Sequence, residues 1–415
     1  MPVNSMNQQP PTSIKPKISP DTPVCEILKR YPETRKVFRH YGIEIDEKSP
    51  EYVIHLGAFL KEHKIDKKGF IWQLEEQIPD PINIIPPGLA ERGYNQRGIN
   101  FLALLPCPVK VPFDTAFAGL LSRTWDNSPP FTYLLESNAN NQLSYYEYVR
   151  KFTDISQMPD IVISPGLNGY YFRDFFEKFR AKKLFMDPME PGISPYLHLD
   201  MQDPDHQYSV LGANIEVLMI DHTRMGDLEI PEKWSDLLKP EYENALTIRG
   251  QEGFFCETVL LSIYAEFGIQ GVRQLAKAVR SGSHPAEMVK AAKYRRLEAP
   301  PISILPLFFA KLAEKSPDVS IIWPEEGPIV SPVTMIIKKD HPANLDPLIS
   351  FLAGKETGSI LSTASFPSMT DVPPCVDTSS QFNWIGWDYI LSHDLGAEID
   401  LISEEFSRLF YGKTA

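Results

Sequence analysis

The residue types best suited to ligand chemistry lie in four short turns, each placed after a predicted strand and before a predicted helix. The turns span residues 106–110, 164–169, 249–253 and 281–284. The first three belong at the carboxyl ends of parallel strands, where open α/β sheets bind ligands. Backbone N–H groups at the following helix starts favour negatively charged groups. We therefore expect these turns to line one ligand-binding site.

The turns contain thiols, cations, short polar side chains and glycines. The candidate ligand-binding residues are Cys107, Lys110, Ser164, Gly166, Asn168, Arg249, Gly250, Gly253, Cys256, Glu257, Ser283 and His284. Arg249 could bind a carboxylate or phosphate through its forked guanidinium, or it could pair with Glu252. The serines and Asn168 could equally be ordinary helix caps, so the shared placement counts for more than any single residue.

Two cysteines are the least ordinary members of this set. Cys107 stands between two prolines, so a rigid loop would hold its sulfur in a fixed direction. Cys256 stands in the first turn of a predicted helix, where the helix N-terminus should lower the pKa of its thiol. Two thiols across a cleft would suit a soft metal or a metal cofactor. The alternative is two small buried residues, and neither a metal nor a cofactor is identified.

Motifs of familiar enzymes are absent from the sequence, which has no P-loop, G-x-S-x-G, H-E-x-x-H or G-x-G-x-x-G. This favours a non-catalytic binding protein. An enzyme on the same scaffold is the alternative, because a fold does not fix a function. Its candidate residues would be Cys107, Cys256, His284 and Glu257.

Composition limits the possible partners. The chain has 415 residues, of which 43% are hydrophobic, enough for two to three domains with large cores. Its net charge of −13 disfavours nucleic acid and anionic membrane surfaces, since both require basic patches. No apolar run approaches the ~20 residues needed to span a bilayer.

The cysteines and the N-terminus indicate where the protein is located. Cys25, Cys107, Cys256 and Cys375 are widely spaced, so we expect four free thiols rather than a disulfide framework. Residues 1–20 are polar and have no apolar core of a secretory signal. We therefore expect a cytoplasmic protein, or a periplasmic or extracellular one only if a leader had been removed.

A family resemblance begins at residues 234–250, WSDLLKPEYENALTIRG, which read as a helical turn, a tight segment and a buried strand. This stretch resembles the second lobe of type II solute-binding proteins of ABC transporters, in the branch that handles iron, polyamines, thiamine and similar ligands. The resemblance returns at residues 323–328 (WPEEGP) and 344–354 (NLDPLISFLAG), and it covers about residues 99–375.

The resemblance implies an α/β fold of two lobes that close over a central cleft by hinge motion. The ligand would be an anion, a metal or a metal complex, and a transporter would be a possible partner. Lobe one would hold about residues 99–215 and 330–415, and lobe two about 216–329. Long strands expected at 208–223 and 329–339 would cross between the lobes.

Further elements follow from the local patterns. A weak strand is expected at residues 145–150, and helices are expected at 113–123, from about 254, and at 384–410, the last in lobe one. Ferric-binding members of the family use adjacent tyrosines from lobe two. Here Tyr170 and Tyr171 fall in lobe one and the matching region, 299–306, has no tyrosine, so we do not expect tyrosine-ligated iron.

The N-terminal part divides into a polar tail (1–17), a small all-α bundle (18–78) and a Pro- and Gly-rich linker (79–98). The bundle is similar to a small domain of unknown function found with hybrid-cluster and iron–sulfur repair proteins. That family usually has a cysteine pair where this chain has residues 44–46, Glu-Ile-Asp. We therefore expect a metal-free docking or dimerisation module that contacts a transporter or another protein.

Overall fold

The chain forms two compact units, and each is described by itself. A computed structural model describes residues 18–31, 34–41, 43–46, 49–63, 65–77, 99–137, 146, 149–190, 192, 194–251, 254–294, 296 and 298–412. The first unit is Met1–Tyr94 with Leu143–Tyr148, and the second is Asn95–Gln142 with Val149–Ala415. The predicted tail at 1–17 and the predicted linker at 79–98 lie outside the described residues.

The first unit is the small all-α bundle that the sequence predicts. Its helices are α1 (Val24–Arg30), α2 (Arg35–His40), α3 (Leu56–Glu62) and α4 (Lys67–Gln77). Phe38 packs edge-on against Phe59 and Phe70, with ring centroids 5.4 and 5.2 Å apart. Helices this short are marginal alone, so this shared aromatic core stabilises them.

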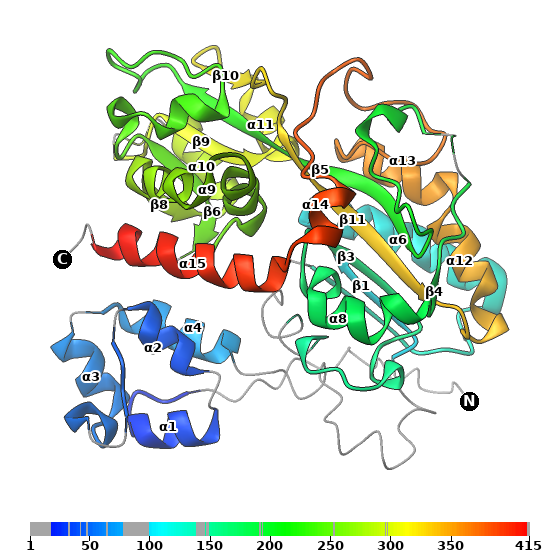
Figure 1. Cartoon of the computed structure of the whole chain (residues 1–415), viewed down its shortest axis with the longest axis horizontal. Coiled ribbons are helices and arrows are strands. Elements are labelled where there is room, and N and C mark those ends of the chain that lie inside the picture. The colour runs from blue at the N-terminus through cyan, green and yellow to red at the C-terminus, as the bar shows by residue number, and fades with distance from the viewer. Residues whose placement is uncertain are drawn as a thin grey trace, which may run out of the picture. The chain divides into compact units, whose positions relative to one another are not determined.

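The second unit is built on a mixed sheet (Figure 1). Its strands are β1 (Phe101–Leu105), β2 (Tyr133–Ser137), β3 (Ile161–Pro165), β4 (Phe185–Met186), β5 (Tyr208–Asp221), β6 (Leu246–Gln251), β7 (Phe254–Phe255), β8 (Val279–Ser283), β9 (Ile302–Pro306), β10 (Val319–Ile322) and β11 (Ile329–Lys338). The strand order is β2-β1-β3-β11-β5-β9-β6-β7. Strands β10, β4 and β8 pair with β5, β11 and β6.

Two long antiparallel strands, β5 and β11, join two lobes, as the sequence predicts (Figure 1). The first half of β5 and the second half of β11 lie in lobe one with β1, β2 and β3. The second half of β5 pairs with β9 and β10 in lobe two. Their β-branched and aliphatic residues are buried on both faces, which explains the near-continuous apolar pattern.

Helices cover both lobes. They are α6 (Cys107–Trp125), α8 (Arg173–Lys178), α9 (Glu257–Ala278), α10 (Pro285–Lys293), α11 (Leu307–Ala313), α12 (Asp346–Leu352), α13 (Lys355–Thr363), α14 (Trp387–Ser392) and α15 (Leu395–Gly412). Short 3-10 turns lie at η2 (Pro50–Tyr52), η4 (Ile155–Gln157), η5 (Gly169–Tyr171), η6 (Arg180–Lys182), η7 (Leu197–Leu199), η8 (Trp234–Leu238), η9 (Pro240–Tyr242) and η10 (Ala343–Leu345). No helix among the described residues is both long and apolar enough to cross a membrane.

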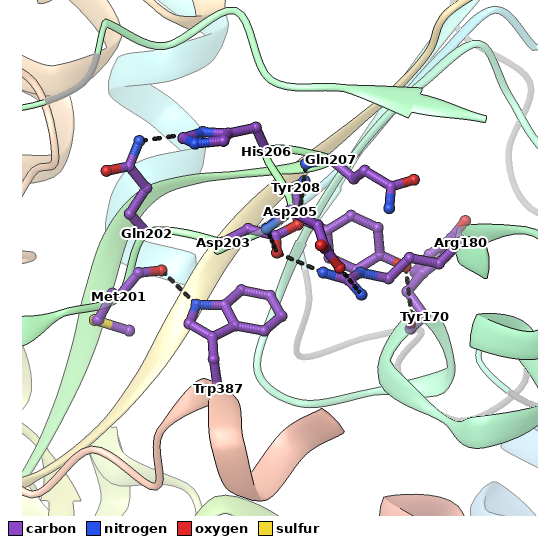
Figure 2. A network of polar contacts seen from close by, with 10 residues as sticks. All are labelled: Tyr170, Arg180, Met201, Gln202, Asp203, Asp205, His206, Gln207, Tyr208 and Trp387. Carbon is purple, nitrogen blue, oxygen red and sulfur yellow. Dashed lines mark hydrogen bonds and ion pairs between the residues drawn. The ribbon is translucent and has the colours of Figure 1, made fainter. Parts of the chain in front are cut away.

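A buried polar network fixes the start of β5 in lobe one (Figure 2). Asp203 accepts hydrogen bonds from the backbone N–H groups of Gln207 and Tyr208 at 3.0 and 2.9 Å, and it pairs with Arg180 at 2.5 Å. The Tyr208 hydroxyl donates to the Tyr170 carbonyl at 2.7 Å. Because a lost partner would leave buried polar groups unsatisfied, the network holds the crossing strand in one position.

The prediction of a loop at residues 106–110 is wrong. Helix α6 begins directly at Cys107 and runs through Pro112. Proline is tolerated in a first helical turn because the N–H groups there have no partner inside the helix. The two prolines beside Cys107 therefore start a helix instead of stiffening a loop. The predicted strand at 145–150 is also wrong where it is described, because Tyr146, Val149 and Arg150 are helical.

The turn predicted after Arg249 is replaced by more strand. Strand β6 runs to Gln251 and pairs with β7, with Gly250 opposite Phe255. Helix α9 therefore begins at Glu257, about three residues later than predicted. Gly253 and Glu252 lie outside the described residues. The predicted turn at 281–284 is likewise mostly strand β8, which pairs with β6.

The C-terminal helix α15 packs on lobe two, whereas the sequence analysis placed it in lobe one. It lies along α9 (Figure 1), and Arg273 of α9 pairs with Glu405 at 2.6 Å. The ring of Phe406 lies 4.6 Å from that of Phe255. After α14 in lobe one, the chain thus returns to cover lobe two. Local sequence patterns cannot reveal this packing of α15 on α9, because the two helices are far apart in the sequence.

Candidate functional site

Residues from both lobes meet at one place, which we call the interlobe site: Cys107 and Ser137 from lobe one, and Arg249 and His284 from lobe two. Cys107 is the first residue of α6, and its Sγ lies 3.1 Å from the Oγ of Ser137 at the end of β2. His284 is near enough to the thiol to interact with it, and this interaction is the main reason why the pKa of Cys107 is lowered. Ser137 and Arg249 act in the same direction, against partial burial.

The side chain of His284 is held in place because it caps helix α10. It is the N-cap of α10, and its Nδ1 accepts a hydrogen bond from the Ala286 N–H at 3.2 Å. Because Nδ1 accepts, the proton of the neutral ring resides on Nε2. Nε2 is thus the nitrogen left to interact with Cys107. In this tautomer Nε2–H can donate to the sulfur and favours the thiolate, but with Nδ1 occupied the ring has no free nitrogen to take the thiol proton.

Arg249 is surrounded by acidic groups. Burial acts to lower the pKa of its guanidinium, but nearby groups raise it overall; these are Cys256, Glu216, Cys107 and Glu257. Glu216 lies on β5 and is 1% exposed; its Oε1 accepts from Asn214 at 2.9 Å. Burial raises the pKa of Glu216, and the Arg249 charge only partly offsets this. The Arg249 cation therefore interacts electrostatically with a buried carboxylate of β5 and with Cys107 of lobe one.

Three helices start at this site. Cys107 begins α6, Cys256 is the N-cap of α9, and His284 is the N-cap of α10. Each helix has a partial positive charge and unpaired N–H groups at that end. Together with Arg249, these ends favour a negatively charged ligand.

The prediction of a lowered thiol pKa for Cys256 is wrong. It is buried, and burial raises its pKa to about 12, with the Glu216 charge adding to the effect. Its Sγ lies 3.9 Å from the Oε1 of Glu216. The helix N-terminus does not lower its pKa, because loss of water outweighs the helix dipole. Cys256 is thus a small buried residue beneath the site.

Three other predicted residues have partners within lobe one. Ser164 is fully buried and accepts a hydrogen bond from Asn168 at 3.2 Å. Asn168 caps η5 and also donates to two backbone carbonyls, so its polar atoms are occupied. Lys110 forms an ion pair with Asp114 one turn along α6. Plain capping, the alternative given for Asn168, describes that residue.

The predicted glycines have geometric roles. Gly166 has a φ of +79°, which glycine adopts without strain, and its N–H donates to the Pro332 carbonyl at 2.7 Å. A Cβ at this position of lobe one would lie 4.0 Å from Thr258 Oγ1 in lobe two. The two lobes therefore approach each other closely at Gly166. Gly250 pairs with Phe255 in the sheet.

Ser283 lines a separate groove of about 570 Å³ on lobe two. The groove is lined by Arg224, Thr247, Arg280, Ser281, Ser283, Glu287, Met288, Ala291, Arg296, Glu298, Ala299, Pro300 and Ser303. Arg224 is engaged there with Asp221 at 2.6 Å and with the Arg296 and Ala299 carbonyls. Within the described part of the chain, no three His, Cys, Asp or Glu side chains are grouped to hold a metal ion.

The adjacent tyrosines are part of the lobe-one core. Tyr170 and Tyr171 are both fully buried. The Tyr171 hydroxyl lies 2.5 Å from the Oγ1 of Thr334, and burial raises its pKa far above the ordinary value. Neither tyrosine belongs to the interlobe site.

Sequence reasoning missed Ser137 and Glu216. Ser137 ends β2, a strand that was not predicted because its apolar run is short and follows two prolines. Glu216 carried a usable signal, since it is a lone carboxylate inside a long apolar strand pattern. A buried charge requires a partner, and Arg249 is the nearby cation.

Comparison with known proteins gives a family match. Residues 156–393, more than half of the chain, match the family described as bacterial extracellular solute-binding protein. Among curated proteins, none shows significant sequence similarity to the chain. The expected cytoplasmic location is therefore wrong, because the matching family is extracellular. Signal peptides are removed from mature proteins, so a polar start is poor evidence on location. The expectation of free cysteines is confirmed for all four.

Solved structures share the fold at low identity. A Trichodesmium protein (IdiA, FutA) in complex with iron and citrate has a TM-score of 0.52, 10% identity, and covers 75% of this chain and 99% of its own. The periplasmic binding protein P5PA has a TM-score of 0.53 and 15% identity, with 74% and 99% covered. A ferric binding protein from Campylobacter jejuni has 0.50 and 12%, with 75% and 98% covered.

Proposed function

Because the chain belongs to the family of bacterial extracellular solute-binding proteins, we propose that it binds a small anion, or a metal carried in an anionic complex, at the interlobe site. The observation that carries the proposal is the meeting of Cys107 from lobe one with Arg249 and His284 from lobe two. Each lobe supplies only part of the contacts, so ligand and closure are linked.

The charge of the ligand follows from the site. Arg249 offers a forked donor, and three helix N-termini add N–H groups of partial positive charge. Glu216 and Glu257 offset part of this charge, which favours a small, localised anion such as a carboxylate. A chelate with carboxylate arms fits the same description, and the similar Trichodesmium protein holds iron and citrate.

Direct iron binding through tyrosine is not part of the proposal. Tyr170 and Tyr171 are buried in lobe one, and β9 in the matching region has no tyrosine. A transporter remains the proposed partner of the closed form, by analogy with the family. The N-terminal bundle is proposed as a docking module, since it has a core of its own.

Native mass spectrometry of protein purified from its source tests the proposal. We expect a bound species of small mass at one copy per chain, and elemental analysis would show whether it contains a metal. Arg249→Ala should purify without that species, whereas Arg280→Ala, an exposed arginine on the neighbouring strand β8, should retain it. Retention in both variants would place the ligand elsewhere.

A further inference from the structure

We propose that the groove on lobe two that contains Ser283 binds a short aliphatic acid that carries a second oxygen, as an oxo acid or a hydroxy acid does. The groove is lined by residues of α10 and of the strands β6, β8 and β9 (Figure 1). Its volume of about 570 Å³ falls within the range of small-molecule sites, roughly 300–1,000 Å³. None of the four residues that define the interlobe site lines it. The proposal therefore goes beyond the function proposed above and does not depend on it.

A row of hydroxyl groups forms the floor of this groove. Thr247 of β6 stands opposite Ser281 of β8 and opposite Ser303 of β9, so the three side chains lie side by side on one face of the sheet. Side chains at the adjacent positions of β6 and β9 point to the other face, and they are aliphatic and fully buried: Leu246, Ile248, Ile302 and Ile304. The two faces of the same strands thus differ in chemistry, and the polar face lines the groove.

Two buried polar groups that line the groove have no hydrogen-bond partner in the protein. Ser303 is 4% exposed, and within the described part of the chain its hydroxyl makes no hydrogen bond. The side chain of Arg224 is 9% exposed and pairs with Asp221 at 2.6 Å, but its Nε has no partner among the described residues. By contrast, the Ser281 hydroxyl donates to the Oγ1 of Thr247 at 3.1 Å. Because folded proteins rarely leave buried polar groups unpaired, a ligand oxygen that accepts from Arg224 and Ser303 completes the site.

The charged side chains that line the groove leave one cation without a partner. Glu287 pairs with Lys290 at 2.6 Å, and Arg296 and Glu298, which are both exposed, offset each other in charge. Arg280 reaches the groove from β8 and forms no ion pair with any described residue. The forked guanidinium of arginine matches a carboxylate. The ligand's single negative charge therefore belongs at Arg280.

Apolar side chains form the remaining wall of the groove. Met288 and Ala291 come from α10, and Pro300 precedes β9. Met288 is 3% exposed. A short carbon chain can bury apolar surface against these residues while its two polar ends bind the arginines and Ser303. Inorganic phosphate lacks this apolar part, and an unsubstituted fatty acid lacks the second oxygen, so each should bind more weakly.

Calorimetric titration of the full chain with 4-oxopentanoate, pentanoate and inorganic phosphate tests the proposal. 4-Oxopentanoate should bind saturably, and pentanoate should bind about five-fold more weakly, because it cannot accept a hydrogen bond at its far end. Phosphate should bind more weakly than either acid. The proposal is overturned if 4-oxopentanoate shows no saturable binding, which would mean that water alone fills the groove, or if phosphate binds as tightly as 4-oxopentanoate.

Two variants assign the binding to the groove. Ser303→Ala removes only the hydroxyl and should abolish the preference for 4-oxopentanoate over pentanoate. Arg280→Ala, at an exposed position that tolerates substitution, should weaken binding of both acids by about five-fold or more. Ser320→Ala on β10, outside the groove, is the matched control and should keep the wild-type affinities. Thermal unfolding checks that each variant is folded.

Arg249→Ala separates the groove from the interlobe site, which also favours carboxylates. If this variant loses the acid while folded Ser303→Ala and Arg280→Ala proteins bind it like the wild type, the acid lies at the interlobe site. The groove proposal is then wrong, although the proposed function stands. If Arg249→Ala loses the copurifying species but keeps its affinity for 4-oxopentanoate, the protein has two separate sites, as we propose.

Discussion

Glu216 and Arg249 show how one residue pair links the fold to the site. Glu216 lies on the strand that crosses between the lobes, and Arg249 lies on β6 near both Glu216 and Cys107. The carboxylate is buried with one oxygen, Oε2, that has no hydrogen-bond partner. Such a group is costly unless a cation is near. The positive charge of Arg249 therefore offsets part of the cost of burying Glu216.

Glu216 predicts a pH dependence of stability. Burial raises its pKa in the folded protein, so the folded state binds this proton more tightly than the unfolded state. Stability should then fall as pH rises from the ordinary glutamate value through the raised one. Glu216→Gln keeps an acceptor for Asn214 and should remove this fall. Urea unfolding at a series of pH values measures it.

Glu404→Gln, at an exposed position of α15, is the matched control and should keep the pH slope of the wild type. If Glu216→Gln also keeps that slope, Glu216 is not the group that titrates.

For single residues, the sequence predicted which side chains stand near the site but not how deeply each one is buried. Cys107, Arg249 and His284 were predicted to belong to one site, since each stands near a strand end or a helix start, and in the structure both Arg249 and His284 act on the Cys107 thiol. Cys256 was predicted by the same rule, yet its burial reverses the sign of its pKa shift. Burial depends on contacts between distant segments, so no local pattern could distinguish the two thiols.

Helix α15 was predicted in lobe one, but it packs on lobe two and buries part of that lobe's core. Its buried face meets α9 and β7, and Phe406 and Phe410 lie 4.6 and 4.8 Å from Phe255. Phe255 immediately precedes the N-cap of α9, which is part of the interlobe site. The helix therefore supports the base of lobe two.

Phe406→Ala should destabilise the protein by about 3–5 kcal/mol, the usual cost of deleting a fully buried phenylalanine ring. Leu401→Ala on the exposed face of the same helix should change stability by less than about 0.5 kcal/mol. Chemical denaturation of both variants measures the difference. A small effect of Phe406→Ala would show that α15 is not required for the stability of lobe two.

The N-terminal bundle makes an independent prediction at this scale. Its apolar residues form one core, including Val24, Phe38, Phe59 and Phe70. Residues 18–78 expressed alone should therefore fold cooperatively, as followed by circular dichroism. Elemental analysis should find no stoichiometric iron or zinc, because Glu44, Ile45 and Asp46 stand where the similar domain has its cysteines. Bound metal, or a chain that does not fold, would contradict this prediction.

The types of the helices and strands were predicted more accurately than their first and last residues. The crossing strands were placed to within two residues, because their patterns are long and uninterrupted. The starts of α6 and α9 were misplaced, since Pro108, Pro112 and Gly253 resemble breaks in a sequence. Pro108 stands in the first turn of α6, where proline is tolerated, whereas Pro112 lies inside the helix and removes one backbone hydrogen bond without ending it.

At the scale of the second unit, function depends on two lobes that share few strands. Among the described strands, β5 and β11 alone run through both lobes, and Gly166 of lobe one approaches Thr258 of lobe two. Small changes in two strands can therefore open or close a site whose halves lie on different lobes. The sequence predicted this arrangement through its resemblance to a family, and the family match confirms it. The ligand itself was not predicted, because it depends on side-chain directions.

The most direct test is calorimetric titration of the species that copurifies with the chain into ligand-free wild type, Arg249→Ala and Arg280→Ala. We predict that Arg249→Ala weakens binding by about 1.5–3 kcal/mol, the scale of a hydrogen bond to a charged group, and that Arg280→Ala binds like the wild type. Equal affinity for all three proteins would contradict the claim that the ligand lies at the interlobe site.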